Sequence, residues 1–325
     1  MNPLYKLLAT LGCLLLLLIP VKGNSQVSTE NDLQKLNLKG KVKSVSSYSY
    51  DISSTTKDSI DNGYCGTLEE TFKHLDDICV QTTEFDRKGN IAKLTRLNTE
   101  LRENMDVYHY NKAGLLTEVE TFMNNGQLLD DGTYDDMHPS EQPKTLVKRL
   151  TYIYDATNRV LKEELKGVTA REPEYTTIYS YTEDYPNVKK TTTENDFSTG
   201  ESYIFFETDQ YDEENRLIGI VRQSKDDPST VTEKFLYNDA DVKIGQDEYE
   251  GDILSGKQYL IYDNRGNLTE YTTVSLDQFL SRDRETLTLK YKYDRFNNWI
   301  RREATHKMKE RPDITVVTER KIVYY

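Results

Sequence analysis

The sequence is poor in the residues that build metal centres and disulfide-rich domains. Its 325 residues include three cysteines, four histidines and one tryptophan. A structural zinc site needs four clustered Cys or His ligands, and these residues are scattered, so we expect no metal site. The sequence also lacks a G-x-x-x-x-G-K-[ST] phosphate loop, an H-E-x-x-H helix and a G-x-S-x-G nucleophile elbow. We therefore expect no cofactor and assign no catalytic residue.

Positive charge is scarce as well. The 42 basic residues are outnumbered by 55 acidic residues, which gives a formal net charge of −13. Without the first 25 residues, which hold two lysines and no acid, the balance is 40 − 55 = −15. Proteins that bind nucleic acid contact phosphates through blocks of Lys and Arg, and no such block is present. We expect neither nucleic acid nor an anionic membrane surface as a partner.

Long apolar runs are absent beyond the N-terminal segment. That segment has Lys6, a mostly apolar run of 13 residues at 7–19, and a small polar stretch at 23–25. A membrane-spanning helix needs about 20 apolar residues, so residues 1–25 predict a cleaved signal peptide. Cys13 lies inside the run, where a lipoprotein cysteine would follow it, so we expect no lipid anchor. The mature chain would be exported to the periplasm, the cell surface or the medium, with no membrane span.

Two cysteines remain after the predicted signal peptide, Cys65 and Cys79. An oxidising compartment would allow them to form a disulfide, which would stabilise the fold by roughly 3 kcal/mol by closing a short loop. Two unpaired thiols, packed as small apolar side chains, fit the sequence equally well. Both alternatives remain open.

A short motif recurs along the chain. An aromatic residue, usually Tyr, is followed by Asp or Asn and, three residues later, in most copies by Gly or Asn. The aromatic positions of successive copies are 25, 44, 27, 30, 26, 25 and 31 residues apart. This regularity indicates one structural unit repeated along the chain. The aromatic positions are Phe85, Tyr110, Tyr154, Tyr181, Tyr211, Tyr237, Tyr262 and Tyr293.

Each copy predicts a β-hairpin. Residues before the Asp alternate in character, as in 289–293, which is typical of a strand. The Asp or Asn side chain can accept hydrogen bonds from backbone N–H groups two residues on, and Gly or Asn tolerates the positive φ that closes a short hairpin. Because the same Tyr recurs in every copy, we interpret it as packing between hairpins. The irregular region at 124–143 is a better candidate for contact with a partner.

The units at 152–160 (Y-I-Y-D-A-T-N-R-V) and 262–268 (Y-D-N-R-G-N-L) resemble YD repeats, the hairpin unit of RHS proteins. The resemblance extends over residues 40–325. In the large RHS relatives, such repeats wind a sheet into a hollow shell around a cargo domain. No cargo domain is recognisable here, so the resemblance implies a small, exported, stand-alone repeat protein without encapsulation.

These units predict an all-β fold in one domain. Residues 26–37 would form a polar lead-in, and residues 38–325 a meander of antiparallel hairpins. An open sheet of about 17 strands tends to curl or split, so we expect a large, strongly twisted or curled sheet, up to a half-shell. The apolar segment at 320–325 would form a free edge, which allows self-association through edge strands.

The repeat and the lack of catalytic motifs favour a non-enzymatic exported scaffold. Its partner would be a protein or a glycan, or its role would be structural in the cell envelope. The alternative is a hydrolase with a carboxylate site on the edge formed by the variable loops. With 55 acidic residues, carboxylate pairs arise freely by chance, so no pair is singled out and no binding residue is assigned.

Overall fold

The structure is a computed structural model, which describes residues 31–51, 78–98, 103–124, 144–181, 187–276, 284–307 and 313–325. The predicted signal peptide, Cys65 and nearly all of the 124–143 region lie outside these residues. Cys79 lies in a described strand, but its side chain is not described. The signal peptide and the state of the two cysteines therefore stay predictions.

The described residues form eighteen strands, each antiparallel to the strand that follows it in the chain. This is the connectivity of an up-and-down meander. The strands are β1 (Val42–Asp51), β2 (Ile78–Phe85), β3 (Ile91–Asn98), β4 (Glu103–Tyr110), β5 (Leu116–Asn124), β6 (Lys144–Tyr154), β7 (Val160–Gly167), β8 (Tyr175–Tyr181), β9 (Val188–Asp196), β10 (Glu201–Tyr211), β11 (Leu217–Ser224), β12 (Thr230–Tyr237), β13 (Lys243–Glu250), β14 (Ile253–Tyr262), β15 (Leu268–Ser275), β16 (Arg284–Tyr293), β17 (Trp299–Lys307) and β18 (Ile314–Tyr324).

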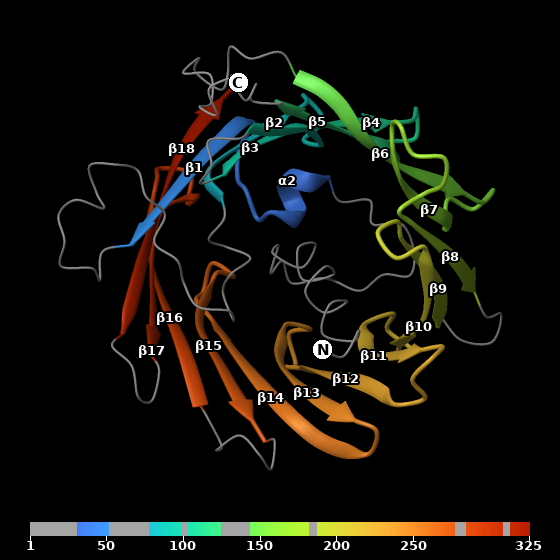
Figure 1. Cartoon of the computed structure of the whole chain (residues 1–325). Coiled ribbons are helices and arrows are strands. Elements are labelled where there is room, and N and C mark those ends of the chain that lie inside the picture. The colour runs from blue at the N-terminus through green and yellow to red at the C-terminus, as the bar shows by residue number, and fades with distance from the viewer. Residues whose placement is uncertain are drawn as a thin grey trace, which may run out of the picture.

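The sheet closes on itself, because the last strand pairs with the first. The β1–β18 ladder runs from Val42–Tyr324 to Asp51–Val316, while β1 also pairs with β2 and β18 also pairs with β17. The strands therefore form a ring, with blue β1 beside red β18 (Figure 1). The predicted open, curled sheet or half-shell is wrong. The predicted free edge at 320–325 is wrong as well, since β18 is paired on both sides.

Two physical causes favour closure. An open sheet leaves a row of unpaired backbone N–H and C=O groups at each edge, and closure pairs both rows. Bulges supply curvature: in the β6–β7 hairpin, Ile153 pairs with Lys162 and Tyr154 with Val160, which leaves Leu161 as an extra residue. Bulges increase local twist and bend the strand that carries them. Because the motif repeats this irregularity, the sheet keeps turning until its two ends meet.

Seven hairpins share one turn, and we call the end of the barrel that they form the uniform rim. In the β6–β7 turn, Asp155 Oδ1 accepts hydrogen bonds from the N–H groups of Thr157 (2.8 Å) and Arg159 (2.9 Å), and Asn158 has a φ of 67°. The predicted turn chemistry is thus confirmed. The seven turns begin at Asp86, Asn111, Asp155, Asp212, Asn238, Asp263 and Asp294, with positive φ at Gly89, Gly114, Asn158, Asn215, Asp241, Gly266 and Asn297.

The repeated tyrosines tie each hairpin to the preceding one. Tyr154 Oη donates a hydrogen bond to the carbonyl oxygen of Leu116 (2.7 Å), and Tyr237 Oη donates to that of Leu217 (2.6 Å). Each bond joins the tyrosine at the end of one hairpin's first strand to the first residue of the second strand of the preceding hairpin. The interpretation of these tyrosines as packing residues is confirmed. Equivalent bonds are donated by Tyr110 and Tyr181. In the last copy the repeated Tyr293 donates to Asp263 Oδ2, and Tyr291, two residues earlier, donates to the carbonyl oxygen of Leu268.

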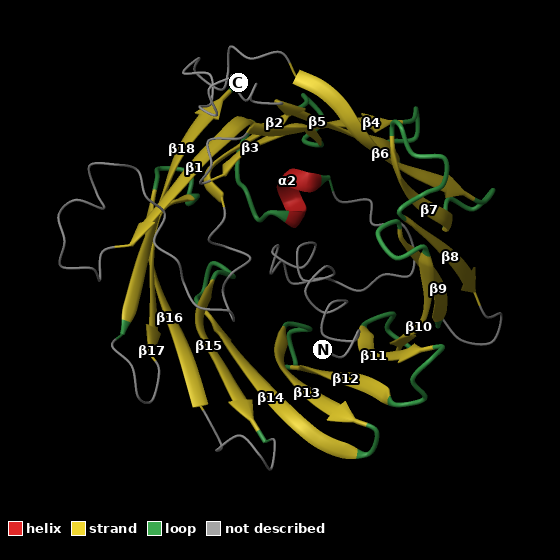
Figure 2. Ribbon diagram, viewed as in Figure 1, coloured by secondary structure: helices red, strands yellow, loops and turns green. Residues whose placement is uncertain are grey.

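A short helix, α2 (Asp32–Lys35), lies inside the ring of strands (Figures 1 and 2). Its N-terminus is a capping box, in which the Asn31 side chain accepts from the Gln34 N–H and the Gln34 side chain accepts from the Asn31 N–H. This reciprocal arrangement satisfies two donors that a helix start leaves free. The sequence analysis treated 26–37 as a polar lead-in and missed the helix.

The position of α2 identifies the inner face of the sheet. Leu33 and Leu36 pack against a buried cluster of Val42, Val45 and Phe85, so these strand residues point inward. Successive strand residues point to opposite faces, and the cross-strand register carries this assignment around the barrel. A second buried cluster lies on the inner face of β14–β16 and consists of Leu260, Leu268 and Leu289.

Candidate functional site in the barrel interior

The inner face of β9–β12 carries a row of alternating charges. Lys190, Glu207 and Arg222 lie directly opposite one another on β9, β10 and β11. Lys190 Nζ is 2.6 Å from Glu207 Oε1 and 2.7 Å from Asp209 Oδ2. Arg222 Nε is 2.6 Å from Glu207 Oε2, and Arg222 also pairs with Glu233 on β12. We call these five residues the ion-pair network.

Both cations of the ion-pair network have carboxylate partners. Burial by itself would raise the pKa of Glu207, but Lys190 and Arg222 lower that pKa to about 2. Burial would lower the pKa of Arg222, but Glu233 and Glu207 raise it, and Lys190 behaves in the same way beside Glu207 and Asp209. The positive charges on this wall are therefore neutralised by their own neighbours.

The inner face of β17 and β18 carries two arginines without acidic partners. Arg302 lies opposite Thr318 and donates from Nη2 to its Oγ1 (3.2 Å). Arg320 lies two residues along from Thr318 on the same face of β18. The Nε atoms of both arginines are buried without an acceptor, and the carboxylates of the described residues form no ion pair with either guanidinium. We call Arg302 and Arg320 the arginine pair.

Aromatic rings surround the arginine pair. Arg320 Cζ lies 3.3 Å from the ring centroid of Trp299, and Arg302 Cζ lies 5.4 Å from it. Tyr291 lies opposite Arg302 on β16, with its ring centroid 5.9 Å from that of Trp299. Contact with an aromatic face stabilises a cation by about 0.5–2 kcal/mol, which is less than the cost of burying an unpaired charge.

The electrostatics of the arginine pair differ from those of the ion-pair network. Burial lowers the pKa of Arg302, and burial together with the charge of Arg302 lowers the pKa of Arg320. A guanidinium nevertheless remains protonated at neutral pH. This wall of the barrel therefore holds two adjacent positive charges that no described carboxylate neutralises.

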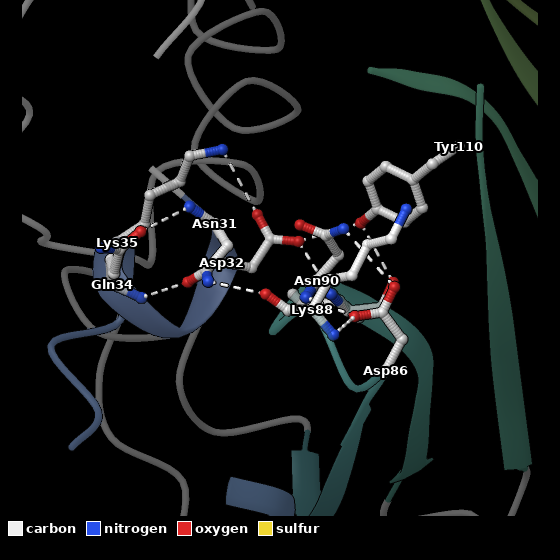
Figure 3. Close-up of polar contacts among 9 residues, drawn as sticks. Asn31, Asp32, Gln34, Lys35, Asp86, Lys88, Asn90 and Tyr110 are labelled. Carbon is white, nitrogen blue, oxygen red and sulfur yellow. Dashed lines mark hydrogen bonds and ion pairs between the residues drawn. The ribbon is translucent and has the colours of Figure 1, made fainter. Parts of the chain in front are cut away.

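Residues 31–40, which we call the strap, run inside the uniform rim (Figures 1 and 3). At the β2–β3 turn, Asn31 Nδ2 donates to the carbonyl oxygen of Lys88 (2.7 Å), and the Leu33 N–H donates to that of Gly89 (3.0 Å). Gly89 has a φ of 90°, and a Cβ at this position would lie 2.7 Å from Asn31 Nδ2. Other equivalent turns have Asn or Asp at the positive-φ position, so what glycine adds here is room for the close approach of the Asn31 side chain.

Asp32 is the main polar anchor of the strap (Figure 3). Its Oδ2 atom accepts hydrogen bonds from the Ile91 N–H (2.8 Å) and from Tyr110 Oη (2.9 Å). Tyr110 is one of the repeated tyrosines, and burial followed by the charge of Asp32 raises its pKa well above the ordinary range. One carboxylate thus joins the strap to both β3 and β4.

The other end of the strap docks on two further turns. Asn37 Nδ2 donates to the carbonyl oxygen of Arg265 in the β14–β15 turn (3.0 Å). The Lys39 N–H donates to Asn298 Oδ1 (2.7 Å), and Asn298 Nδ2 donates to the Lys39 carbonyl oxygen (2.8 Å). The strap therefore connects the β2–β3, β14–β15 and β16–β17 turns across the inside of the uniform rim.

The outer face of the barrel is rich in charged side chains that pair across neighbouring strands. Lys257 Nζ on β14 is 3.0 Å from Asp247 Oδ1 on β13. Arg149 on β6 lies 3.2 Å from Glu118 and 3.1 Å from Glu120 on β5. An Arg or Lys that faces lipid at the bilayer midplane costs about 2–4 kcal/mol, and Lys257 and Arg149 lie in the middle of their strands. The outer face at this height is suited to contact with water.

Exposed apolar residues gather on the outer face near the uniform rim. Ile153, Leu236 and Ile261 each directly precede a repeated tyrosine, and they are between 43% and 53% exposed. Ile218 and Ile244, which are the extra residues of two bulges, are exposed at the same height. We call these five residues the apolar belt. The apolar belt itself is one or two residues high, and the exposed rings of Tyr259, Phe206 and Tyr48 lie further from the uniform rim on the same face. A transmembrane barrel carries a continuous apolar band about 25 Å tall.

Within the described strands, the structure brings Glu207, Asp209 and Glu233 together inside the barrel, where the cations of the ion-pair network engage them. The predicted carboxylate site on the variable edge is not found in the described part of the chain, which leaves out most loops of that edge. Among the described residues, no three or more His, Cys, Asp or Glu side chains are placed to hold a metal ion. No helix in the described parts of the chain is long and apolar enough to cross a membrane.

Neither the arginine pair nor the ion-pair network was predicted from the sequence. For the arginine pair a signal was available, because Arg320 stands four residues before Tyr324 and therefore shares its face of the strand. For the ion-pair network no local signal exists. Its cations and carboxylates come together only through the register of four strands.

Comparisons with known proteins give the fold no family name. No family model matches the chain, and no curated protein matches it. A solved porin-like protein from Bacteroides uniformis is 11% identical with a TM-score of 0.42, and covers 87% of this chain and 98% of its own length. A porin-like protein from Bacteroides vulgatus is 14% identical with a TM-score of 0.29, and covers 76% and 94%. A protein of unknown function from Bacteroides fragilis is 14% identical with a TM-score of 0.22, and covers 50% and 92%.

The resemblance to YD-repeat and RHS proteins is therefore wrong. The sheet is a closed barrel of eighteen strands, and no family model matches the chain. The predicted scaffold, which would bind a protein or glycan on an open sheet, is wrong for the same reason, because both edges of the sheet are paired. Identities of 11–14% carry no activity over to this chain, so its function has to be argued from the barrel itself.

Proposed function

We propose that this protein is a transport protein that binds a polar solute inside its β-barrel and does not change it chemically. The observation that supports this most is a closed sheet of eighteen strands with charged and aromatic side chains on its inner face. Barrels of about 16–18 strands are wider than their side chains can fill and leave a water-filled interior. A solute would therefore have room beside the ion-pair network and the arginine pair.

The outer face supports a carrier that is surrounded by water. Mid-strand charges such as Lys257 and Arg149 have partners on neighbouring strands, and they would be costly in lipid. These charged pairs interrupt the exposed apolar surface of the outer face at mid-strand, whereas a transmembrane barrel has a continuous apolar band. With the predicted signal peptide, the chain would reach a compartment of the cell envelope and act there as a lumenal carrier.

A second candidate is a channel that crosses an outer membrane by its strands. The apolar belt favours it, because exposed isoleucines and leucine near one rim could contact lipid. Two of the similar solved structures are described as porin-like. The charged pairs at mid-strand oppose this candidate, so the two functions make opposite predictions about detergent and conductance.

The test uses the purified full chain and its single tryptophan, Trp299, which is on the inner face. A carrier should stay monodisperse without detergent, give no stepwise conductance in planar bilayers, and show quenching of Trp299 by acrylamide, a small neutral solute. A Trp299→Phe/Ile300→Trp double variant moves the fluorophore to the outer face and gives the quenching expected for contact with water.

Each outcome has a definite reading. Stepwise conductance together with a requirement for detergent would replace the carrier with the channel. If acrylamide does not quench Trp299 but does quench the Ile300→Trp control, and no conductance is seen, the interior is closed to solutes and the proposed transport function is wrong.

A further inference from the structure

We propose that the arginine pair binds an oxyanion, a carboxylate or a phosphate group, of the solute carried in the barrel. This inference rests on the proposed lumenal function and adds the chemical class of the ligand. Its basis is the juxtaposition of Arg302 and Arg320 on the inner face, next to Trp299 and without a carboxylate partner among the described residues.

Among the described residues, neither arginine of the pair has a carboxylate counter-ion. Arg302 donates to a neutral hydroxyl, that of Thr318, and Arg320 lies against the neutral ring of Trp299. The Nε atoms of both arginines are buried without an acceptor, while the side chains as a whole are partly exposed. A partly desolvated charge without a counter-ion destabilises a fold, and like charges side by side add to the cost. A protein retains such a pair at a functional site when a ligand supplies the opposite charge.

The same barrel shows how it neutralises an arginine that serves structure alone. Arg222 lies between Glu207 and Glu233 and contacts both. The inner-face positions that flank the arginine pair in the register carry hydroxyls instead. Ser47 lies opposite Arg320 on β1, and Ser49 lies opposite Thr318. At these described positions the wall therefore offers hydroxyl and guanidinium donors to a ligand and no carboxylate.

The planar geometry of the two guanidinium groups also suits an oxyanion. A guanidinium presents its N–H donors in one plane, which matches the paired oxygens of carboxylate and phosphate. The indole of Trp299 covers the face of Arg320 and so leaves these donors, which all lie in the plane of the guanidinium, available to a ligand. Thr318 holds Arg302 at 3.2 Å, so both planes are fixed before a ligand arrives, and little side-chain entropy is lost on binding.

The experiment measures binding of three probes to the purified full chain by isothermal titration calorimetry, with Trp299 fluorescence as a local readout. Inorganic phosphate and glucuronate test the two sources of an oxyanion, and glucose is the neutral control. We expect saturable binding of phosphate, glucuronate or both, a fluorescence change at Trp299, and no binding of glucose. Binding should weaken as salt is raised, because its main contribution is electrostatic.

Matched variants assign the binding to the arginine pair. Arg302→Gln and Arg320→Gln should each lower the affinity by tenfold or more. Arg301→Gln is the control, since Arg301 is adjacent in sequence but lies on the outer face and pairs with Glu319; it should bind like the wild type. Arg320→Lys keeps the charge and loses the planar donors, so it should fall between wild type and Arg320→Gln, and it serves if the Gln variants do not fold.

Three results would overturn the inference or its foundation. Absence of binding of either anion, while acrylamide still quenches Trp299, would refute the oxyanion site and leave the lumenal transport function standing. Anion binding that is unchanged in both Gln variants, or in the Lys variant when the Gln variants do not fold, would place the anion elsewhere and refute the assignment. Exclusion of acrylamide from Trp299 would refute the transport function, and the oxyanion site with it.

Discussion

Two walls of one barrel hold arginine in opposite ways. Arg222, on the inner face of β11, contacts two carboxylates, and these raise its pKa against the effect of burial. Arg302 and Arg320, on the inner face of β17 and β18, contact a hydroxyl and an indole, and burial lowers the pKa of both. The residue type and its inward orientation are the same, so the difference comes from the neighbours alone.

The comparison shows that each half of the barrel is stabilised by different interactions. The half around β9–β12 is held by the ion-pair network. The half around β14–β18 and β1–β2 contains both buried apolar clusters and the docking sites of the strap. Since apolar packing and the strap hold this second half, its two arginines are not needed as structural ion pairs. Their charge is available for a ligand.

The largest expected effect comes from breaking the ion-pair network. Arg222→Met leaves Glu207 without one of its two cations and Glu233 without this partner. Removal of one partner from a buried pair costs about 3–5 kcal/mol, because the remaining charge stays buried. Urea denaturation should show a loss of this order relative to the wild type. A loss below about 1 kcal/mol would mean that the network behaves like exposed surface pairs, and the contrast between the walls would disappear.

The second expected effect is that acid lowers the free energy of unfolding through the ion-pair network. The pKa of Glu207 is about 2 in the folded protein, below the ordinary value of about 4.3. A carboxylate with a lowered folded pKa contributes its full stability above the unfolded pKa and loses it as the pH falls toward the folded pKa. We therefore expect the free energy of unfolding to drop between pH 4.3 and pH 2 in the wild type.

The acid effect has to be measured by difference, since other groups act in the opposite direction. Burial raises the pKa values of Glu194 and Glu248, so protonation of these two raises the free energy of unfolding as the pH falls. The informative quantity is the pH profile of the wild type minus that of Glu207→Gln. Parallel profiles would show that Glu207 does not carry the predicted linkage.

The third effect tests whether the strap stabilises the part of the barrel that lacks the ion-pair network. Asp32→Ala removes the acceptor of two hydrogen bonds, from the Ile91 N–H and Tyr110 Oη. Tyr110 Oη keeps the Ile91 carbonyl oxygen as an acceptor, but the Ile91 N–H loses its partner, and a partly buried donor left unsatisfied costs about 1–3 kcal/mol. Hydrogen exchange should show faster opening of β2–β4 than of β9–β12. Equal acceleration in both halves would mean that the barrel opens as one unit.

The local units of this fold were readable in the sequence, while their closure was not. The turn at Asp155 to Asn158 follows from side-chain chemistry and from the backbone conformations that Asn tolerates, and both are local properties. Closure depends on whether β1 and β18 meet, which is set by twist summed over eighteen strands. The extra residue in each uniform hairpin, such as Leu161, contributes to that twist, and the open-sheet prediction did not include it.

The candidate site was partly readable. Alternation along β18 assigns Arg320 to the face of Tyr324, so an inward arginine could have been found. Its missing partner could not, because that absence is a property of the strands on either side. The strap illustrates the same limit: the Asn31 and Gln34 capping box is a local signal for α2, but the bond from Asn37 to Arg265 joins residues 228 positions apart.

The smallest expected effect has the opposite sign from the first and separates the two walls most sharply. Arg320→Met replaces an unpaired buried charge with an apolar side chain of similar length, which should raise the free energy of unfolding by about 1 kcal/mol. Arg302→Met should do the same, and the double variant should gain less than the sum, because each substitution removes the repulsion felt by the other. Arg301→Met on the outer face should change stability by no more than about 0.5 kcal/mol.

Saturating oxyanion should stabilise the wild type and leave Arg320→Met unchanged, since a ligand stabilises only the state that binds it. If Arg320→Met loses stability without ligand, Arg320 has a partner that compensates its charge, and that charge serves the structure.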